Sequence, residues 1–141
     1  MKAQWLALIT AAAWGVGGYF EKKGLHAGQL PPQVGITVRT AVALVVLGVA
    51  SFPQWKTLAQ AGAKPLFSLA VGGGLVAGSL GMLCFYAALK KAPLGVVMPI
   101  AFTSPLFGAL VGAALGGETL SPRTLLGMLM TVGGIALIAI R

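Results

Sequence analysis

The chain has 141 residues, of which 57% are hydrophobic and only 9% are charged. An ordinary soluble domain carries about 25% charged residues, and a chain of this length cannot bury so much apolar surface in water, so we expect it to lie in a lipid bilayer. The net charge of +8 does not indicate nucleic-acid binding, because the basic residues are scattered between apolar runs and form no basic stripe.

The composition also argues against enzyme chemistry of the soluble kind. Cys84 is the only cysteine and His26 the only histidine. A zinc site needs about four Cys, His or acidic ligands, and a catalytic triad would depend on His26 in a polar loop. We therefore predict no catalytic residue, no metal and no cofactor, and we expect Cys84 to be an inert, buried thiol.

Five apolar segments are predicted to be transmembrane helices: residues 4–20, 33–52, 66–89, 93–115 and 120–140. Each has close to the ~20 residues that a helix needs to cross a bilayer, and none alternates like a barrel strand. The linkers between them are short. The predicted fold class is an all-α integral membrane protein with one domain over residues 1–141.

The first segment has two interpretations. Lys2, the run WLALIT and Ala11-Ala12-Ala13 resemble a secretory signal with a small-residue cleavage site, whereas the apolar run that continues to Phe20 favours an uncleaved helix. Glu21-Lys22-Lys23 is predicted to end this helix at the water interface. Glu21 is then an interfacial anchor, with a proton-coupling role as the alternative.

Arg39 lies six residues into the second segment, counted from Gln33, which is about 9 Å along a helix. Charges inside a membrane are usually functional, so Arg39 could face a cavity and hold an anionic substrate or an acidic partner. It could also extend to the interface as an anchor. Glu21 is expected at the same membrane side, so the two residues could form an ion pair.

Two helices carry small residues at intervals of four. Such faces let helices approach closely, so we predict helix packing there, with helix sliding during transport as a sharper interpretation. The residues are Gly73, Ala77 and Gly81 in the third segment and Gly108, Gly112 and Gly116 in the fourth.

The fourth segment contains two prolines, Pro99 and Pro105. Each removes a backbone donor and loosens the preceding helical turn. In lipid the freed carbonyls need partners, for which Thr103, Ser104 and cavity water are candidates. Broken helices of this kind mark transporter sites, and a simple kink is the alternative.

The fifth segment begins at Ser121-Pro122, with serine as the N-cap and proline in the first turn. Glu118 precedes it, where the helix dipole favours an acid. In an antiparallel dimer, Glu118 of one subunit would reach the same membrane face as Arg39 and Glu21 of the other.

The basic residues give almost no orientation signal. The N-terminal side of the five predicted spans would hold four of them and the opposite side five, whereas the positive-inside rule needs an excess on one side. We expect insertion in both orientations; the alternative is a fixed topology decided by a translocon partner or by Arg39. The two sets are Lys2, Lys56, Lys64 and Arg123, and Lys22, Lys23, Lys90, Lys91 and Arg141.

Several short motifs resemble a known family in their order and spacing. They are Trp14-Gly15 with Lys22, Arg39, Phe85-Tyr86-Ala87-Ala88-Leu89, Pro99, Gly117-Glu118 with Leu120, Gly127, and Gly133-Gly134. Over nearly its whole length the chain resembles a single EamA domain of the drug/metabolite transporter superfamily. The resemblance implies five helices that make half of an inverted-repeat fold of ten.

Typical members of this family carry two such domains in one chain, in opposite orientations. Inverted-repeat transporters place their site between the repeats, near the bilayer midplane. A single repeat lacks the second wall, so we expect an antiparallel homodimer, the arrangement of the related small multidrug transporters with four helices each.

The function expected from these features is alternating-access transport of a small organic metabolite or drug-like solute across the cytoplasmic (inner) membrane. One alternative is a flippase-like translocator of a lipid-linked anion. A second is a non-transporting membrane subunit that needs a different partner chain. The candidate substrate-binding residues are Trp14, Tyr19, Arg39, Tyr86, Met98, Pro99, Phe102, Thr103 and Ser104.

Overall fold

The computed structural model describes residues 3–116 and 119–139, and these are helical apart from short turns. The chain divides into two compact units, Met1–Lys91 and Ala92–Arg141, and each is described by itself. No strand occurs in the described residues, in agreement with the all-α prediction. Glu118, for which a dipole or inter-subunit role was expected, lies outside the described residues.

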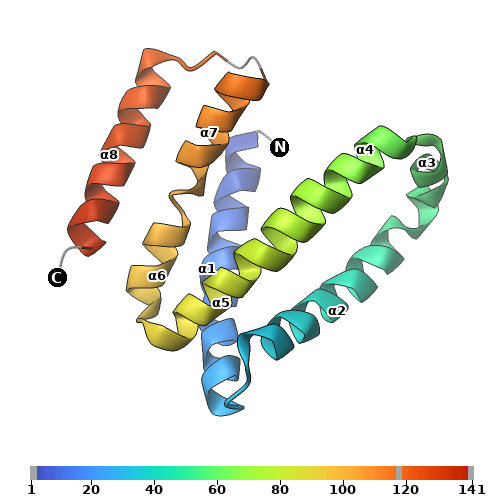
Figure 1. Cartoon of the computed structure of the whole chain (residues 1–141), viewed down its shortest axis with the longest axis horizontal. Helices are drawn as coiled ribbons and strands as arrows, with labels where there is room; N and C mark the ends of the chain where they lie inside the picture. Colours follow the sequence, from blue (N-terminus) through green and yellow to red (C-terminus); the bar gives the residue numbers. More distant parts are fainter. Residues whose placement is uncertain (1–2, 117–118, 140–141) are drawn as a thin grey trace. The chain divides into compact units, whose positions relative to one another are not determined.

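The first unit consists of two long helical stretches that follow helix α1 (Figure 1). One contains α2, the short η1 and α3; the other runs without a break through α4, the π-helical segment η2 and α5. Gly62, with φ of 77°, makes the bend between them. The elements are α1 (Ala3–Ala27), α2 (Pro32–Ser51), η1 (Phe52–Gln54), α3 (Trp55–Gln60), α4 (Ala63–Ser68), η2 (Leu69–Gly81) and α5 (Met82–Lys91).

The buried core of this unit lies where α1, α2 and α5 meet. The buried hydrophobic side chains there are those of Leu25, Ile36, Tyr86 and Leu89. Gly35 allows the close approach, because a Cβ atom at this position would lie 2.6 Å from Cδ2 of Leu25 and 3.0 Å from Cε1 of Tyr86. The glycine therefore sets the distance between α2 and its two neighbours.

Helix α1 continues past the end that the sequence suggested. The prediction that Glu21-Lys22-Lys23 ends the helix at Phe20 was wrong, because the helix runs to Ala27. Glutamate and lysine are good helix formers, so charge alone does not stop a helix. Its end is a Schellman motif, in which Leu30 N–H donates to Leu25 O at 3.0 Å and Gln29 takes a left-handed φ of 48°.

The second unit contains α6 (Leu94–Ala101), α7 (Ser104–Leu115) and α8 (Pro122–Ala139). The predicted helix over 93–115 is broken at Phe102 and Thr103, where Phe102 N–H donates to Met98 O at 2.9 Å and Leu106 N–H to Thr103 O at 2.9 Å. Pro99 and Pro105 flank this break. Ser121 caps α8 by accepting the Thr124 N–H at 3.1 Å, as its sequence position indicated.

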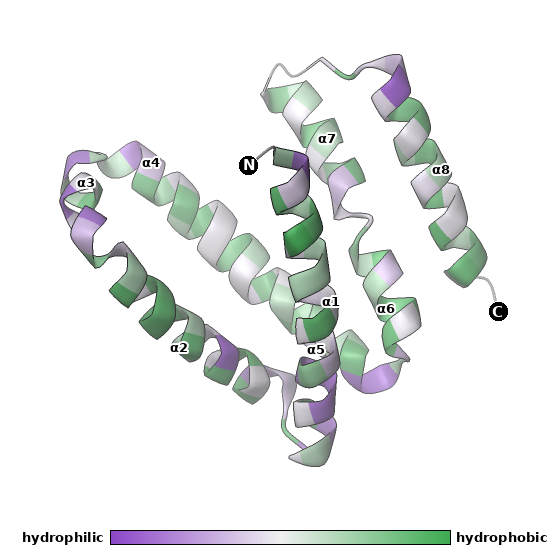
Figure 2. Ribbon diagram, turned by 180° about the vertical axis from the view of Figure 1, so that it is seen from behind, coloured by the Kyte–Doolittle hydropathy of each residue, from purple (hydrophilic) through white to green (hydrophobic). Residues whose placement is uncertain are grey.

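Within residues 3–116 and 119–139, three helical stretches are long and apolar enough to cross a membrane: Pro32–Gln60, Ala63–Lys91 and Leu94–Leu115. Pro122–Ile138 is a shorter apolar helix. Hydrophobic residues predominate along much of α2 and along the stretch from α4 toward α5 in Figure 2, with hydrophilic residues gathered at α3 and at the end where α1, α2 and α5 meet. The chain is thus a multi-pass membrane protein, and the full set of five spans stays a prediction.

Candidate functional site

A cluster of three polar side chains joins α1, α2 and α5, and we call Glu21, Arg39 and Tyr86 the Glu21 cluster. Arg39 Nε lies 2.9 Å from Glu21 Oε1, with side chains that are 42% and 20% exposed respectively. The Tyr86 hydroxyl lies close enough to the Glu21 carboxylate to interact with it. Tyr86 itself is only 1% exposed. Tyr86 is therefore the buried end of the cluster, and Arg39 is its exposed end.

Helical spacing explains how the three side chains meet. Residues three or four apart lie on the same face of a helix. Glu21 is four residues before buried Leu25, Arg39 is three after buried Ile36, and Tyr86 is three before buried Leu89. The apolar contacts thus fix the three helices, and the Glu21 cluster lies about one turn from them.

The Glu21 cluster compensates the charge of Arg39 and leaves guanidinium donors for a ligand. A lone charge in apolar surroundings is costly unless it is paired, and here the carboxylate neutralises the guanidinium. The guanidinium has five N–H donors, and the ion pair is made through its Nε atom. The more exposed member of the pair is the cation, so the site can accept an anion from the side of Arg39.

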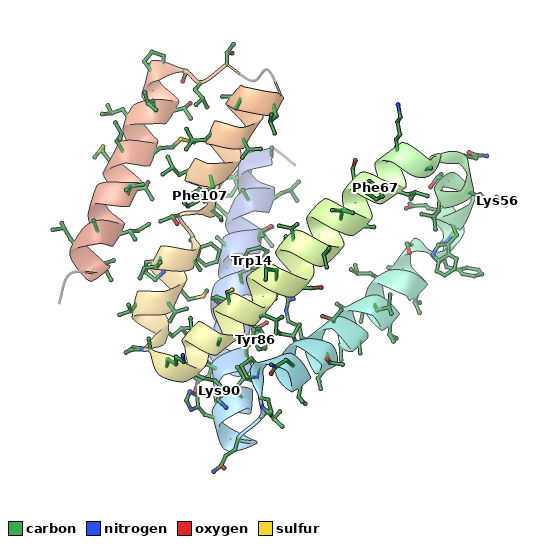
Figure 3. All side chains as sticks on the ribbon, in the orientation of Figure 1. Trp14, Lys56, Phe67, Tyr86, Lys90 and Phe107 are labelled. Atoms are coloured by element: carbon green, nitrogen blue, oxygen red, sulfur yellow. The ribbon has the colours of Figure 1, made fainter. Side chains whose placement is uncertain are left out.

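Two further contacts tie the same end of the unit together. Lys90 Nζ donates to Leu30 O at 3.0 Å, and His26 Nε2 lies 3.4 Å from Leu89 O. Figure 3 shows Lys90 and Tyr86 on the last turns of α5, near the connection between α1 and α2. These contacts hold the loop between α1 and α2 against α5, which keeps the helices of the Glu21 cluster in place.

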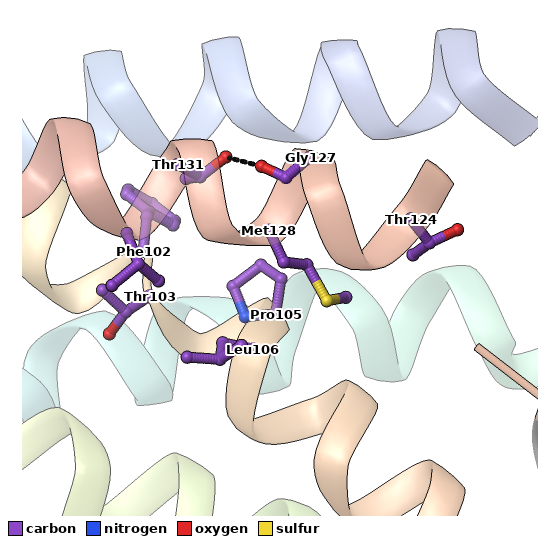
Figure 4. A pocket seen from close by; sticks show the side chains of 9 residues that line it. Phe102, Thr103, Pro105, Leu106, Thr124, Gly127, Met128 and Thr131 are labelled. Carbon is purple, nitrogen blue, oxygen red and sulfur yellow. Dashed lines mark hydrogen bonds between the residues drawn. The ribbon is translucent and has the colours of Figure 1, made fainter. Parts of the chain in front are cut away.

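The second unit contains a cavity of about 360 Å³ between the helix break and α8. Its walls are mainly apolar, and Thr103 and Thr131 direct their hydroxyls to carbonyls of their own chain segment, Ile100 O at 2.8 Å and Gly127 O at 2.9 Å. The cavity therefore suits an apolar group better than a charged one. The lining residues are Phe102, Thr103, Pro105, Leu106, Thr124, Gly127, Met128, Thr131 and Val132 (Figure 4).

The predicted substrate-binding residues fall into two groups, one in each unit. In the first unit, Arg39 and Tyr86 belong to the Glu21 cluster, whereas Trp14 and Tyr19 are exposed on α1. In the second unit, the cavity is lined by Phe102 and Thr103 and by neither Met98, Pro99 nor Ser104.

Sequence reasoning missed the contribution of α8 to the cavity. Thr124, Gly127, Met128 and Thr131 line it from this helix. They recur at intervals of three, four and seven residues, the spacing of one helix face. Two threonines on one face of an otherwise apolar helix were the available signal.

The predicted packing glycines and Cys84 have surroundings that bear on two further expectations. A Cβ atom at Gly73 or Gly108 would meet nothing within 4 Å, so their role in helix packing stays a prediction. The expectation that Cys84 is buried was wrong, because this cysteine is exposed. Tyr86 and Leu89 occupy the packed face of α5, and Cys84 lies off that face.

Comparison with known proteins gives one family and two relatives. Residues 1–140 match the EamA-like transporter family. The chain is 35% identical over 97 residues, 67% of its length, to a probable 4-amino-4-deoxy-L-arabinose-phosphoundecaprenol flippase subunit ArnF of Aeromonas hydrophila subsp. hydrophila. It is 33% identical over 81 residues, 57% of its length, to a probable subunit ArnE of the same kind of flippase from Erwinia tasmaniensis.

The extent of these matches differs. The aligned part spans 66% of the ArnF relative, just under two thirds of its length, and 74% of the ArnE relative. No solved structure matches the chain.

Proposed function

The chain belongs to the EamA-like transporter family, and from this premise we propose that it is a membrane subunit that translocates a lipid-linked, phosphate-bearing anion. The family is one of transporters and the relatives are flippase subunits, so the protein is a transport protein and not an enzyme. The observation that carries the proposal is the half-exposed Arg39 within a helix of membrane-spanning length. A cation kept at such a place is usually functional.

The chemistry of a lipid-linked anion fits the two features of the chain. A phosphate group is recognised by the planar fork of an arginine side chain. An apolar tail needs an apolar surface, of which the cavity beside α8 is one example. The names of the two relatives, which specify a phosphoundecaprenol-linked sugar, support this class of substrate.

Transport of a small organic solute is the second candidate function. The volume of the cavity, about 360 Å³, lies within the range of about 300–1,000 Å³ usual for small-molecule sites. A soluble solute would need polar groups in that cavity, but the hydroxyls of Thr103 and Thr131 donate to backbone carbonyls. The hydroxyl of Thr124 is hydrogen-bonded to the Ser121 hydroxyl. The lipid-linked substrate is therefore favoured.

We propose that the translocation pathway needs a second chain. Inverted-repeat transporters form their site between two halves, and the resemblance to a single EamA domain provides one half. Balanced basic residues support an antiparallel homodimer, whereas the word "subunit" in both relatives' names supports a different partner chain. Co-expression of two differently tagged copies distinguishes these assemblies: recovery of both tags together supports the homodimer, and co-purification of another membrane protein with one tag supports a different partner.

The proposed function can be tested in vesicles that contain the purified protein. The probe is phosphatidic acid with a fluorescent group on one acyl chain, and an impermeant reductant quenches the outer leaflet. Quenching beyond the outer-leaflet share, absent from protein-free vesicles, supports translocation of a lipid-linked anion. Uptake of soluble organic anions without lipid movement would instead support solute transport.

A further inference from the structure

We propose that Arg39 is a phosphate-binding residue whose ion-pair partner is Glu21, and that a ligand phosphate displaces Glu21 from it. This inference rests on the proposed function, since it assigns a role to Arg39 in holding the anion. The ion pair of 2.9 Å joins Arg39 Nε to Glu21 Oε1. Glu21 thus acts as an internal competitor for the site.

The difference in exposure makes the exchange geometrically simple. The Arg39 side chain is 42% exposed and the Glu21 side chain 20%. Arg39 is therefore the more accessible member of the pair for an incoming anion. Arginine has a long side chain with several rotatable bonds, so its guanidinium can turn outward while α1, α2 and α5 keep their packing.

Tyr86 provides for the displaced carboxylate. It is buried, and its hydroxyl interacts with the Glu21 carboxylate. When Arg39 leaves, this hydroxyl remains beside Glu21 as an available donor, which lowers the cost of an unpaired acid. Without Tyr86, displacement would leave the carboxylate with no partner in the cluster.

The guanidinium keeps donors for a phosphate while it is paired with Glu21. A phosphodiester, the form in a phosphoundecaprenol-linked sugar, carries one negative charge on two non-bridging oxygens, and a monoester such as phosphatidic acid carries about −1.5 to −2. Either can bind the guanidinium fork through two oxygens, whereas the ion pair with Glu21 is made through Nε. Lys22 and Lys23 follow Glu21 directly in sequence, and a local excess of positive charge draws anions toward the cluster.

The competition predicts that removing the acid strengthens binding. When Arg39 is free of Glu21 for only a fraction of the time, the apparent affinity for phosphate is the intrinsic affinity multiplied by that fraction. If Glu21 occupies Arg39 for about 90% of the time, removing the acid raises the apparent affinity roughly ten-fold. Glu21→Gln keeps an acceptor for Tyr86 and removes the negative charge. Glu21→Asp keeps the charge on a shorter side chain, so its affinity is expected between those of wild type and Glu21→Gln.

The experiment measures phosphate binding to the full chain in nanodiscs, by calorimetric titration with inorganic phosphate. A second set of discs contains phosphatidic acid, and thermal stabilisation is recorded. Glu21→Gln should bind roughly ten-fold more tightly than wild type, and Arg39→Gln should lose binding. Gln60→Lys on α3, which raises the net charge by the same amount elsewhere, should behave like wild type.

The outcomes separate this inference from the proposed function. If Glu21→Gln raises the affinity for free phosphate alone, the ligand is a soluble phosphate. If it raises the stabilisation by phosphatidic acid alone, the ligand is a lipid headgroup. Either result supports the exchange of Glu21 for phosphate. An affinity of Glu21→Gln equal to that of wild type or of Gln60→Lys would overturn it, as would Glu21→Asp tightening as much as Glu21→Gln. Lipid movement in vesicles tests the function independently, and can fail while the affinity gain persists.

Discussion

Arg39 of α2 and Glu21 of α1 form an ion pair of 2.9 Å between Nε and Oε1, about one helical turn from buried Leu25 and Ile36. The pair explains how a cation is kept in a helix that is otherwise apolar, because each charge supplies the other's counter-ion. The same pair can also bind an anion, because its more exposed member is the cation.

Gly35 is expected to be the least replaceable glycine of α2. A Cβ atom there would approach Leu25 to 2.6 Å, and overpacking of this kind costs about 1–3 kcal/mol. Gly35→Ala should therefore lower the midpoint of thermal unfolding in detergent. Gly48→Ala in the same helix, where nothing lies within 4 Å, is the control and should not lower it. Equal stability of the two variants would contradict the close packing of α1, α2 and α5.

Gln29 is expected to gain stability when it becomes glycine. Its φ of 48° is left-handed, which is unfavourable for residues with a side chain. After allowing for the greater freedom of glycine in the unfolded chain, Gln29→Gly should raise the free energy of unfolding by about 0.5–1 kcal/mol. Gln33→Gly, inside α2, should lower it by about as much. Denaturant titration of both variants provides the test, and a loss of stability in Gln29→Gly would argue against the Schellman motif at the end of α1.

The cavity beside α8 can be filled without a backbone clash. Gly127 lines it, and a Cβ atom at this glycine meets nothing within 4 Å. If the cavity holds the apolar part of the substrate, Gly127→Phe should slow lipid movement in vesicles roughly ten-fold, which corresponds to about 1.4 kcal/mol. Gly133→Phe on the same helix is also free of near contacts and lies outside the lining, so it should retain activity. Retained activity in both variants would exclude the cavity from the pathway.

The sequence predicted where most helices lie, but it predicted less well which side of each helix packs against its neighbours. Length and apolar content located α2, the stretch from α4 to α5, and the pair α6 and α7, because spanning a bilayer requires about 20 apolar residues. The end of α1 was misplaced, since its cap uses Gln29 in a left-handed conformation, where glycine is the usual signal.

The partners within the candidate site were harder to predict than its location. Glu21 and Arg39 were expected at the same side of the membrane, so the sequence suggested that they could pair. The structure brings them together. The interaction of Tyr86 with Glu21 depends on how α5 is rotated against α1. That rotation is set by tertiary contacts of Leu89 and Gly35, which periodicity alone does not specify.

Dual orientation is expected from the balance of basic residues. Ala27→Cys at the end of α1 and Ala61→Cys after α3 flank one helical stretch of membrane-spanning length, and neither changes a charge. In a Cys84→Ala background, an impermeant thiol reagent on intact cells should label both positions, each in part. Labelling of only one position would show a fixed orientation and would exclude the antiparallel homodimer.

The central claim is that Arg39 holds a lipid-linked phosphate during its movement across the bilayer, and lipid movement in vesicles tests it most directly. The measurement compares wild type, Arg39→Gln and Arg123→Gln with fluorescent phosphatidic acid and with a phosphatidylcholine of the same acyl chains. The account predicts selective movement of phosphatidic acid by wild type and Arg123→Gln, with loss in a folded Arg39→Gln. Equal movement of both lipids, or unchanged movement in Arg39→Gln, would contradict it.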